Sequence, residues 1–227
     1  MISVVCVFWG DKFPIEYVYN LQSMVKRNTT VPHEFVVFSD RQIPNIKTKI
    51  LDKGLSGWWN KMQLFNTKFG LQKDVVYFDL DTVITGNIDW LMNYDTVLMG
   101  IEDLGSVNKH QPHLIGRFQS GVMKWNYVLG NSVWNTFLQN QHVMGMIRGD
   151  GEFLNEFIPK ERRELIQRVF PNRLKSYKYQ VYGEGLRDKT SIVCFHGRPS
   201  IIEAMNETVK TSIAEYKPQN WIKDYWR

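Results

Sequence analysis

The stretch VVYFDLDTVIT (75–85) joins a run of apolar, β-prone residues to two acids, Asp79 and Asp81, that are separated only by Leu80. Side chains alternate between the two faces of an extended chain, so both carboxylates are expected on one side and Leu80 in the core. Neighbouring like charges repel each other, and a cation between them would relieve the repulsion. Carboxylate oxygens suit Mg²⁺ and Mn²⁺. The stretch therefore indicates either a divalent-metal site at a strand end or an acidic turn, which is also common there.

Strand and helix patterns alternate on the amino-terminal side of this stretch. Strands are predicted at 2–9, 33–40, 46–51 and 74–79, and helical spacing of apolar residues predicts helices at 13–26 and 58–69. Such alternation favours an α/β fold, Rossmann-like, with a mostly parallel central sheet flanked by helices. Ligands gather at the carboxyl ends of the strands in such sheets, so Asp79 and Asp81 stand where a ligand is expected.

Beyond residue 90 the alternation loosens. Strands are predicted at 96–103 and 118–126, a helix at 131–147, a turn opening a short helix at 149–158, and a strand running into a loop at 191–200. Residues 104–117 are rich in Gly, Asn, His and Pro and are predicted to form a flexible surface loop. No repeat or linker divides the chain, so residues 1–227 are predicted to form a single domain.

Composition and charge narrow the class of protein. The chain is 43% hydrophobic and 14% aromatic, which is typical of a globular domain. The net charge of +5 comes without a long basic run; it fits an anionic substrate such as a nucleoside diphosphate and also fits weak nucleic-acid or membrane contact, and nucleic-acid binding has only this mild basicity in its favour. No apolar segment approaches the roughly 20 residues that cross a bilayer, and the amino terminus lacks a signal-peptide pattern. Cys6 and Cys194 lie in apolar runs and are predicted to be buried thiols, so a cytoplasmic location is expected.

Segments along nearly the whole chain match, in order, the pattern of one enzyme family. They are VVCVFWGDKFPIEYVYNLQSMVKRN (4–28), GWWNKMQLF (57–65), VVYFDLDTVITGNID (75–89), FQSGVMKWN (118–126), GDGEFLN (149–155) and VCFHGRPS (193–200). This order resembles the nucleotide-sugar-dependent glycosyltransferases of the type A fold, in particular the glycogenin-like group with its D-x-D motif. The sequence departs from the family pattern where Gln119 replaces an Asn, Gly151 a Gln, Arg198 a Lys, and Ser200-Ile201 a Pro-Trp pair.

The resemblance implies a metal-dependent glycosyltransferase. It would move a sugar from a nucleotide-diphosphate sugar, with UDP favoured, to a carbohydrate, lipid or protein acceptor, with retention of configuration. Residues 1–103 would be the nucleotide-sugar-binding half, and 104–227 the acceptor and catalytic half with the C-terminal segment. The donor-binding residues so implied are Phe8, Trp9, Gly10, Asp11, Lys61, Asp79, Leu80, Asp81, Ser120, Gly121, Gly197 and Arg198.

The resemblance also implies a metal set and catalytic residues. Asp79, Asp81 and His196 would bind the ion, and the histidine shifts the preference towards Mn²⁺ over Mg²⁺. The implied catalytic residues are Asp150, Glu152 and Lys61. Asp150 and Glu152 would face the reacting sugar carbon, although acids at a helix N-terminus also serve simply to complement the helix dipole. A hydrogen-bonded histidine at a strand end is likewise the ordinary alternative for His196.

Other functions fit parts of the pattern. FDLDTVIT (78–85) also resembles the nucleophile motif of haloacid-dehalogenase-like phosphatases, with Asp79 as nucleophile, although that motif usually lies on the first strand and Asn155 stands where a further acid is expected. A nucleotidyltransferase or a non-catalytic nucleotide-binding protein would use similar acids. The C-terminal segment YKPQNWIKDYWR (216–227) is predicted to pack across the domain or to make peripheral membrane contact.

Overall fold

The computed structural model describes residues 1–107 and 111–227. Within them, one sheet has seven strands in the order β3-β2-β1-β4-β7-β6-β8. These strands are β1 (Ile2–Phe8), β2 (His33–Ser39), β3 (Lys47–Ile50), β4 (Asp74–Phe78), β6 (Leu98–Glu102), β7 (Phe118–Asn126) and β8 (Glu164–Leu165). All neighbours run parallel except that β7 is antiparallel to both β4 and β6. The predicted α/β class with a mostly parallel sheet is therefore confirmed.

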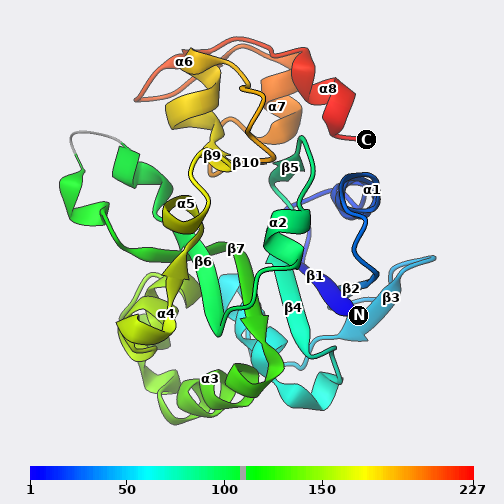
Figure 1. The fold of residues 1–227 in the computed structure, drawn as a ribbon, viewed down its shortest axis with the longest axis vertical. Coiled ribbons are helices and arrows are strands. Elements are labelled where there is room, and N and C mark those ends of the chain that lie inside the picture. Colours follow the sequence, from blue (N-terminus) through cyan, green and yellow to red (C-terminus); the bar gives the residue numbers. More distant parts are fainter. Residues whose placement is uncertain (108–110) are drawn as a thin grey trace.

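A smaller sheet and several helices cover the large sheet. The small sheet has the order β5-β10-β9, formed by β5 (Thr82–Ile84), β10 (Ile192–Cys194) and β9 (Leu174–Ser176), and β11 (Val209–Lys210) pairs with β12 (Glu215–Tyr216). The helices are α1 (Glu16–Asn28), α2 (Asp89–Met92), α3 (Tyr127–Gln139), α4 (Asp150–Phe157), α5 (Ile166–Val169), α6 (Tyr182–Glu184), α7 (Ile201–Asn206) and α8 (Trp221–Tyr225). Figure 1 shows α3 and α4 on one side of the large sheet and the small sheet with α6, α7 and α8 on the other.

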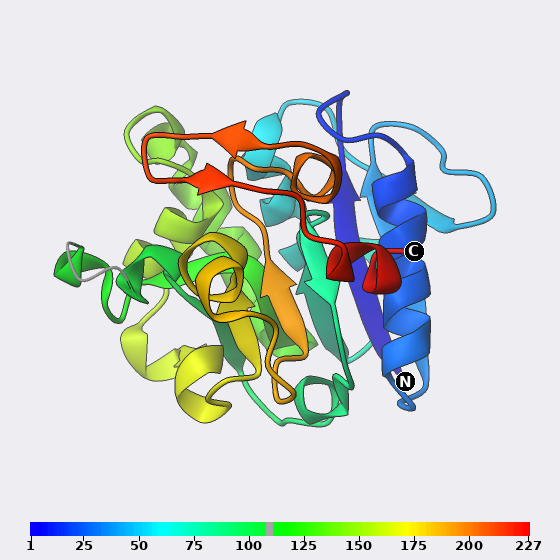
Figure 2. The same cartoon turned by 90° about the horizontal axis from the view of Figure 1, so that it is seen from above.

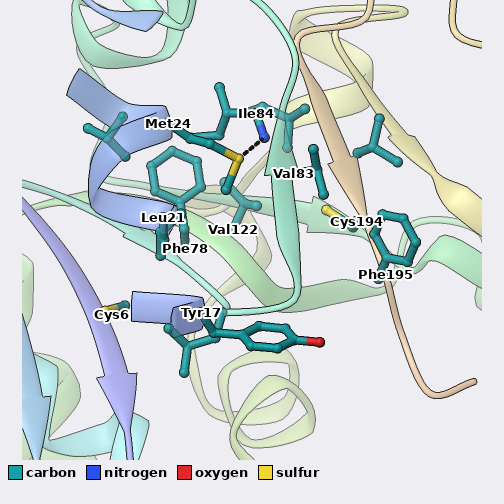
Figure 3. Packing of buried hydrophobic residues seen from close by; sticks show 14 of the residues in the cluster. Cys6, Tyr17, Leu21, Met24, Phe78, Val83, Ile84, Val122, Cys194 and Phe195 are labelled. Atoms are coloured by element: carbon teal, nitrogen blue, oxygen red, sulfur yellow. Dashed lines mark hydrogen bonds between the residues drawn. The ribbon is translucent and has the colours of Figure 1, made fainter. Parts of the chain in front are cut away.

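Alternate residues of the central strands fill two separate apolar cores. On β4, Val76 and Phe78 belong to the core shared with α1 and the small sheet, whereas Val75 and Tyr77 belong to the core shared with α3 and α4. Figure 3 shows the first of these cores, where the sulfur of Met24 accepts a hydrogen bond from the Ile84 amide at 3.3 Å. The period-two alternation of a strand thus builds a three-layer domain around one sheet.

The two cysteines lie where the sequence predicts. Cys6 and Cys194 are both free and buried, and both belong to the core that α1 and the small sheet share. Burial raises the pKa of each thiol above its usual value, since the charged thiolate loses its hydration there. They therefore act as small apolar side chains rather than as reactive thiols.

The prediction of an amphipathic helix at 58–69 is wrong. The chain there forms a 3₁₀ helix, η1 (Gly57–Phe65), and a second short 3₁₀ turn after an extended Asn66. Buried Gln63 bonds through its side chain to Asn60 and to both backbone groups of Asp52. These tertiary hydrogen bonds fix polar side chains inside the core, and helical spacing alone does not reveal them.

Several predicted boundaries also move. The helix predicted at 13–26 begins only at Glu16, after Pro14, and the helix predicted at 131–147 is α3, which ends at Gln139 and is followed by a 3₁₀ turn. The strand predicted at 118–126 coincides with β7. The predicted loop at 104–117 contains 3₁₀ turns at Leu104–Val107 and Pro112–Leu114, and 108–110 lie outside the described residues.

The C-terminal segment packs across the domain, as one of its two interpretations predicts. The ring of Trp226 lies edge-on to Tyr17 of α1 at 4.9 Å, and Ile222 is fully buried. The guanidinium of Arg27 donates a hydrogen bond to the Tyr225 carbonyl at 2.7 Å. Seen from above in Figure 2, α8 lies beside α1. In the described part of the chain, no helix has the length and apolar content needed to cross a membrane.

Asp89 ties α2 to the end of α1, and this contact leads to a first prediction. Its carboxylate accepts hydrogen bonds from the Thr29 hydroxyl and from the hydroxyl and amide of Thr30, the last at 2.9 Å. The bonds from Thr29 and Thr30 hold the pKa of Asp89 well below its usual range. A carboxyl group with a lowered folded-state pKa stabilises the fold above its unfolded pKa and loses that contribution as the pH falls.

We expect Asp89→Asn to lower the free energy of unfolding at pH 7 by about 1 kcal/mol, because the carboxylate is only partly buried. The difference from the wild type should shrink as the pH falls below about 4, where the unfolded-state carboxyl becomes protonated. Urea unfolding at pH 7 and pH 3 measures both values. Exposed Asp95, changed to Asn, is the control and should differ by less than about 0.5 kcal/mol. An equal loss at both pH values would contradict this explanation.

Candidate active site

A cavity of about 350 Å³ opens at the carboxyl end of β4, beside the amino end of β7. Its lining comes from η1, from the turn after β4, from the facing ends of β6 and β7, from the start of α4 and from the end of β10. The lining residues are Trp58, Lys61, Asp79, Asp81, Thr82, Ile101, Asp103, Leu104, Arg117, Gln119, Ser120, Gly121, Arg148, Gly149, Asp150, Gly151, Glu152, Cys194, Phe195 and His196. Most of the polar residues singled out from the sequence therefore meet in one place.

The D-x-D segment forms the turn between β4 and β5. The amide of Asp79 donates to the carbonyl of Gly121 at 2.8 Å, and the amide of Phe195 donates to the carbonyl of Asp81 at 2.9 Å. Leu80 is buried in the core, as predicted, while both aspartates line the cavity. The turn is therefore fixed by backbone bonds to β7 on one side and to the end of β10 on the other.

Lys61 lies between two of the carboxylates. Its Nζ is 2.8 Å from Oδ1 of Asp79 and 3.7 Å from Oδ2 of Asp150, and 5.2 Å from the ring centre of Tyr77. The hydroxyl of Tyr77 donates a hydrogen bond to Asp79 as well. Burial disfavours the ammonium, but the charges of Asp150 and Asp79 outweigh it and raise the pKa of Lys61 above its usual value. Lys61 therefore stays positively charged inside the cavity.

Asp81 and Asp150 are harder to ionise than ordinary aspartates. Burial, followed by repulsion from Asp79, raises the pKa of Asp81 to about 7. Burial also raises the pKa of Asp150, because Lys61 at 3.7 Å is too distant for a hydrogen bond and does not offset the lost hydration. Oδ2 of Asp150 is buried without a hydrogen-bond partner among the described residues. Both carboxyl groups line the cavity, and a charged or polar ligand there would replace the interactions that they lose on burial.

Glu152 has a different environment from Asp150. Its carboxylate accepts from the Arg148 amide at 2.7 Å and pairs with the Arg117 guanidinium at 3.1 Å. These contacts, with the Arg148 bond first, lower its pKa. Glu152 thus holds the entry to α4, as an acid near a helix N-terminus commonly does, whereas Asp150 presents its carboxyl group to the cavity.

His196 lines the cavity, with its Nε2 at 2.8 Å from the hydroxyl of Ser176. Burial, and then the charge of Lys178, lowers the pKa of His196 to about 4, so the imidazole is neutral at pH 7. A neutral imidazole is the form that binds metals.

Asp79 and Asp81 form a donor set that suits Mg²⁺ or Mn²⁺, since such ions often use one or two carboxylates together with water and substrate phosphates. Among the described residues no three His, Cys, Asp or Glu side chains already form a metal cluster, so His196 would have to move to join them.

The remaining sequence-predicted residues lie outside this cavity. Phe8 and Asp11 line a second cavity of about 360 Å³ at the ends of β1 and β2, where the Arg41 guanidinium lies 5.0 Å above the Phe8 ring. Trp9 and Gly10 continue β1 at the same edge but line neither cavity. Gly197 and Arg198 follow His196 without entering the main cavity; the Arg198 guanidinium is largely exposed and pairs with Glu203.

Several lining residues were not predicted from the sequence. Asp103 directly follows β6, and the rule that ligands gather at strand ends would have found it as it found Asp79. Tyr77, a buried core residue that contacts Asp79 without lining the cavity, lies two residues before Asp79 and hence on the same side of the chain. Arg117 and Arg148 lie in loops that carry no recognisable pattern.

The fold that surrounds this cavity is the type A glycosyltransferase fold. The chain is similar to the glycosyltransferase GlyE of Streptococcus pneumoniae TIGR4, with a TM-score of 0.62 and 14% identity over 88% of this chain and 55% of GlyE. It is also similar to the galactosyltransferase LgtC, solved with donor and acceptor sugar analogues, with a TM-score of 0.59 and 12% identity over 88% of each chain. The chain thus spans about half the length of GlyE and most of LgtC. No protein-family model and no curated protein matches the sequence.

Proposed function

We propose that the protein is a glycosyltransferase that uses a nucleotide-diphosphate sugar, with UDP as the nucleotide and a divalent ion, Mn²⁺ or Mg²⁺, as cofactor. The observation that carries the proposal is the turn of Asp79 and Asp81 at the carboxyl end of β4, with Lys61 and Asp150 around the same cavity. A type A glycosyltransferase fold surrounds this turn. The resemblance of the sequence to the glycogenin-like group supports a retaining reaction and implies the same roles for Asp79 and Asp81.

The charges around the cavity suit the bond that such an enzyme breaks. The bond from the anomeric carbon to the diphosphate oxygen breaks, its electron pair stays on the diphosphate, and an acceptor oxygen bonds to the carbon as it loses its proton. Negative charge therefore develops on the leaving diphosphate, and preorganised positive charge lowers the barrier. Asp79 and Asp81, with His196 as a third candidate, would hold the divalent ion, which when bound supplies positive charge beside the diphosphate. Lys61 stays cationic next to Asp79 and adds charge of the same sign.

Asp150 is the acid proposed at the sugar. It is buried, its Oδ2 has no hydrogen-bond partner among the described residues, and it lines the same cavity as the D-x-D turn. As a carboxylate it would orient the sugar and stabilise the positive charge that develops at the anomeric carbon. Glu152, whose carboxylate is engaged by Arg117 and Arg148, would instead keep the start of α4 in place.

The second cavity is the proposed site of the nucleoside. It lies at the carboxyl ends of β1 and β2, along the same edge of the sheet as the D-x-D turn. Asp11 is exposed and offers a carboxylate that accepts hydrogen bonds from hydroxyl groups, whereas the Phe8 ring is buried at the base of the cavity. The Arg41 guanidinium over the Phe8 ring closes one wall. A base and ribose are the kinds of group that such a wall recognises.

The phosphatase and binding-module alternatives have less support. The phosphatase motif usually lies on the first strand, whereas here the D-x-D turn follows β4 in a type A glycosyltransferase fold. A non-catalytic module would bind nucleotide without turnover, and release of UDP from a UDP-sugar separates it from an enzyme.

Calorimetric titration with UDP, GDP and uridine monophosphate, each with and without Mn²⁺, tests the proposed function. We expect tight UDP binding that requires Mn²⁺ and that weakens at least about 100-fold in Asp81→Ala, because one of two metal-binding carboxylates is lost. Asp95→Ala, which removes an exposed carboxylate elsewhere, should bind UDP as the wild type does. If no nucleoside diphosphate binds, with or without Mn²⁺, the proposal is overturned. If UDP binds equally well with and without Mn²⁺, the proposed metal dependence is overturned.

A further inference from the structure

Gly151, the second residue of α4, leaves a space that another side chain fills. A β-carbon on Gly151 would lie 2.5 Å from Oε1 of Gln119, 3.4 Å from Cδ of Gln119 and 3.4 Å from Oγ of Ser120. The shortest of these separations is well inside van der Waals contact. The carboxamide of Gln119, which comes from β7, therefore occupies the volume that any side chain at position 151 would enter.

A fixed hydrogen bond holds that carboxamide in place. Nε2 of Gln119 donates to Oδ2 of Asp103 at 3.0 Å. Asp103 is itself held, because its Oδ1 accepts from the Gly105 amide at 2.9 Å and its own amide donates to the Arg117 carbonyl at 2.9 Å. Because Nε2 donates to Asp103, the orientation of the amide is fixed, and Oε1 points towards Gly151 at the start of α4.

The free end of the carboxamide is an acceptor at the cavity wall. Gln119 lines the cavity together with Ser120, Asp150 and Gly151. Among the described residues, Oε1 accepts no hydrogen bond, whereas Nε2 is committed to Asp103. The cavity thus presents a carbonyl-type oxygen beside the proposed sugar acid Asp150, and a carbonyl oxygen accepts from hydroxyl groups.

Two departures of the sequence from its family pattern have one explanation here. The pattern carries a glutamine where Gly151 stands and an asparagine where Gln119 stands. In this chain the longer carboxamide comes from the strand, and the helix position is reduced to glycine to admit it. The two substitutions are therefore coupled through a single volume.

On this basis, and resting on the proposed function, we propose that Gln119 binds the sugar of the donor through Oε1 and determines which sugars the cavity accepts. A sugar hydroxyl donates to Oε1, while Asp103 keeps the amide from rotating. A donor whose sugar lacks a hydroxyl at that point leaves the acceptor oxygen unpaired, which is the kind of loss that produces strong discrimination. Gln119 is a positioning and specificity residue of the sugar, with no contact to the nucleotide.

The test compares UDP with UDP-sugars on the same variants. With Mn²⁺ present, calorimetry gives the Kd of UDP, UDP-glucose, UDP-galactose and UDP-N-acetylglucosamine for the wild type and for Gln119→Ala. We expect the Kd of UDP to stay within about twofold and the Kd of the best UDP-sugar to rise about tenfold, as for the loss of one hydrogen bond. Gln141→Ala, on the exposed 3₁₀ turn after α3, is the matched control and should change neither value.

A second pair of variants tests the shared volume. In Gly151→Gln alone, the UDP-sugar should bind no more tightly than UDP, because the new side chain would enter the space that the carboxamide of Gln119 occupies. Gly151→Gln combined with Gln119→Asn should recover the affinity gained from the sugar to within about threefold, since the carboxamide then returns from the helix side. Circular dichroism and melting temperature check that each variant is folded, and Gln119→Ala remains a test if the larger side chain at 151 prevents folding.

The outcomes separate this proposal from the proposed function. Equal weakening of UDP and UDP-sugar by Gln119→Ala, or no weakening of either, would overturn the role of Gln119 while the glycosyltransferase assignment stands. A wild type that binds UDP but gains nothing from the sugar would overturn it too. A wild type that binds neither UDP nor any UDP-sugar would overturn the proposed function and the role of Gln119 with it.

Discussion

Lys61→Met is expected to lower the free energy of unfolding by about 3 kcal/mol at pH 7. The ammonium lies 2.8 Å from Asp79 and 3.7 Å from Asp150, and its side chain is only 13% exposed. Methionine keeps most of the volume but removes the charge, so buried Asp150 and half-buried Asp79 both lose their cation. Breaking a buried pair in this way typically costs about 3–5 kcal/mol. The lower end applies because Asp79 keeps the hydrogen bond from Tyr77.

Urea unfolding of a double-mutant cycle measures this effect. Asp150→Asn alone should cost less than about 1 kcal/mol, since a neutral group suits a site where burial already disfavours the charge. Lys61→Met combined with Asp150→Asn should be more stable than Lys61→Met alone, because one of the two unpaired charges is gone. If Lys61→Met loses under about 0.5 kcal/mol, Lys61 does not stabilise the fold and serves the ligand alone.

Phe137→Ala is expected to cost about 4 kcal/mol of the free energy of unfolding. Phe137 is completely buried, and its ring centre lies 5.9 Å from Trp59, 5.5 Å from Phe153 and 5.6 Å from Trp134. Truncation of a buried Phe removes apolar contacts and leaves a cavity, which typically costs about 3–5 kcal/mol. Three rigid ring systems around the site cannot collapse fully into the space.

This aromatic cluster also holds functional segments. Trp59 belongs to η1, which carries Lys61, and Phe153 belongs to α4, which carries Asp150. We therefore expect Phe137→Ala to weaken UDP-sugar binding as well. Its neighbour Leu138 is 46% exposed, so Leu138→Ala is the control and should cost less than about 0.5 kcal/mol. Urea unfolding and calorimetry measure both variants, and equal losses for the two would contradict the assignment of Phe137 to the core.

The local pattern of the sequence was sufficient for six of the seven strands of the large sheet, but not for the two-residue β8. The alternation at 75–78 and the apolar run of β7 depend on burial against both layers, which leaves a periodic signal. Of the small sheet only β10 was predicted, within the strand expected at 191–200; β5 and β9 were not predicted as strands, since they have three residues each and depend on partners far along the chain. The same limit applies to η1, whose form depends on buried hydrogen bonds to Asp52.

Part of the site was predictable for a different reason. Asp79 and Asp81 end a recognisable strand, and Lys61 and Asp150 followed from the resemblance of their segments. The contact between Gln119 and Asp103 was not predictable, because it depends on the irregularity in the pairing of β6 with β7 between Gly100 and Ile101. The partner of β6 shifts there from Met123 to Gln119, so three residues of β7 (120–122) lie between paired positions, and no pattern in either strand predicts this irregularity.

The pairing of β5 with β10 sets the order in which the site is completed. It joins segments about 110 residues apart, and closing such a loop costs about 4 kcal/mol of chain entropy before its contacts repay it. This pairing, the adjacent bond from Phe195 to Asp81 and the bonds from Thr85 to residues 190 and 191 hold the Asp81 and His196 sides of the cavity together. The cavity can therefore form only after residue 194 and the segment that follows it have been synthesised and have left the ribosome. Until then the nascent chain carries a D-x-D turn with one wall missing and has no complete cavity for a ligand to enter.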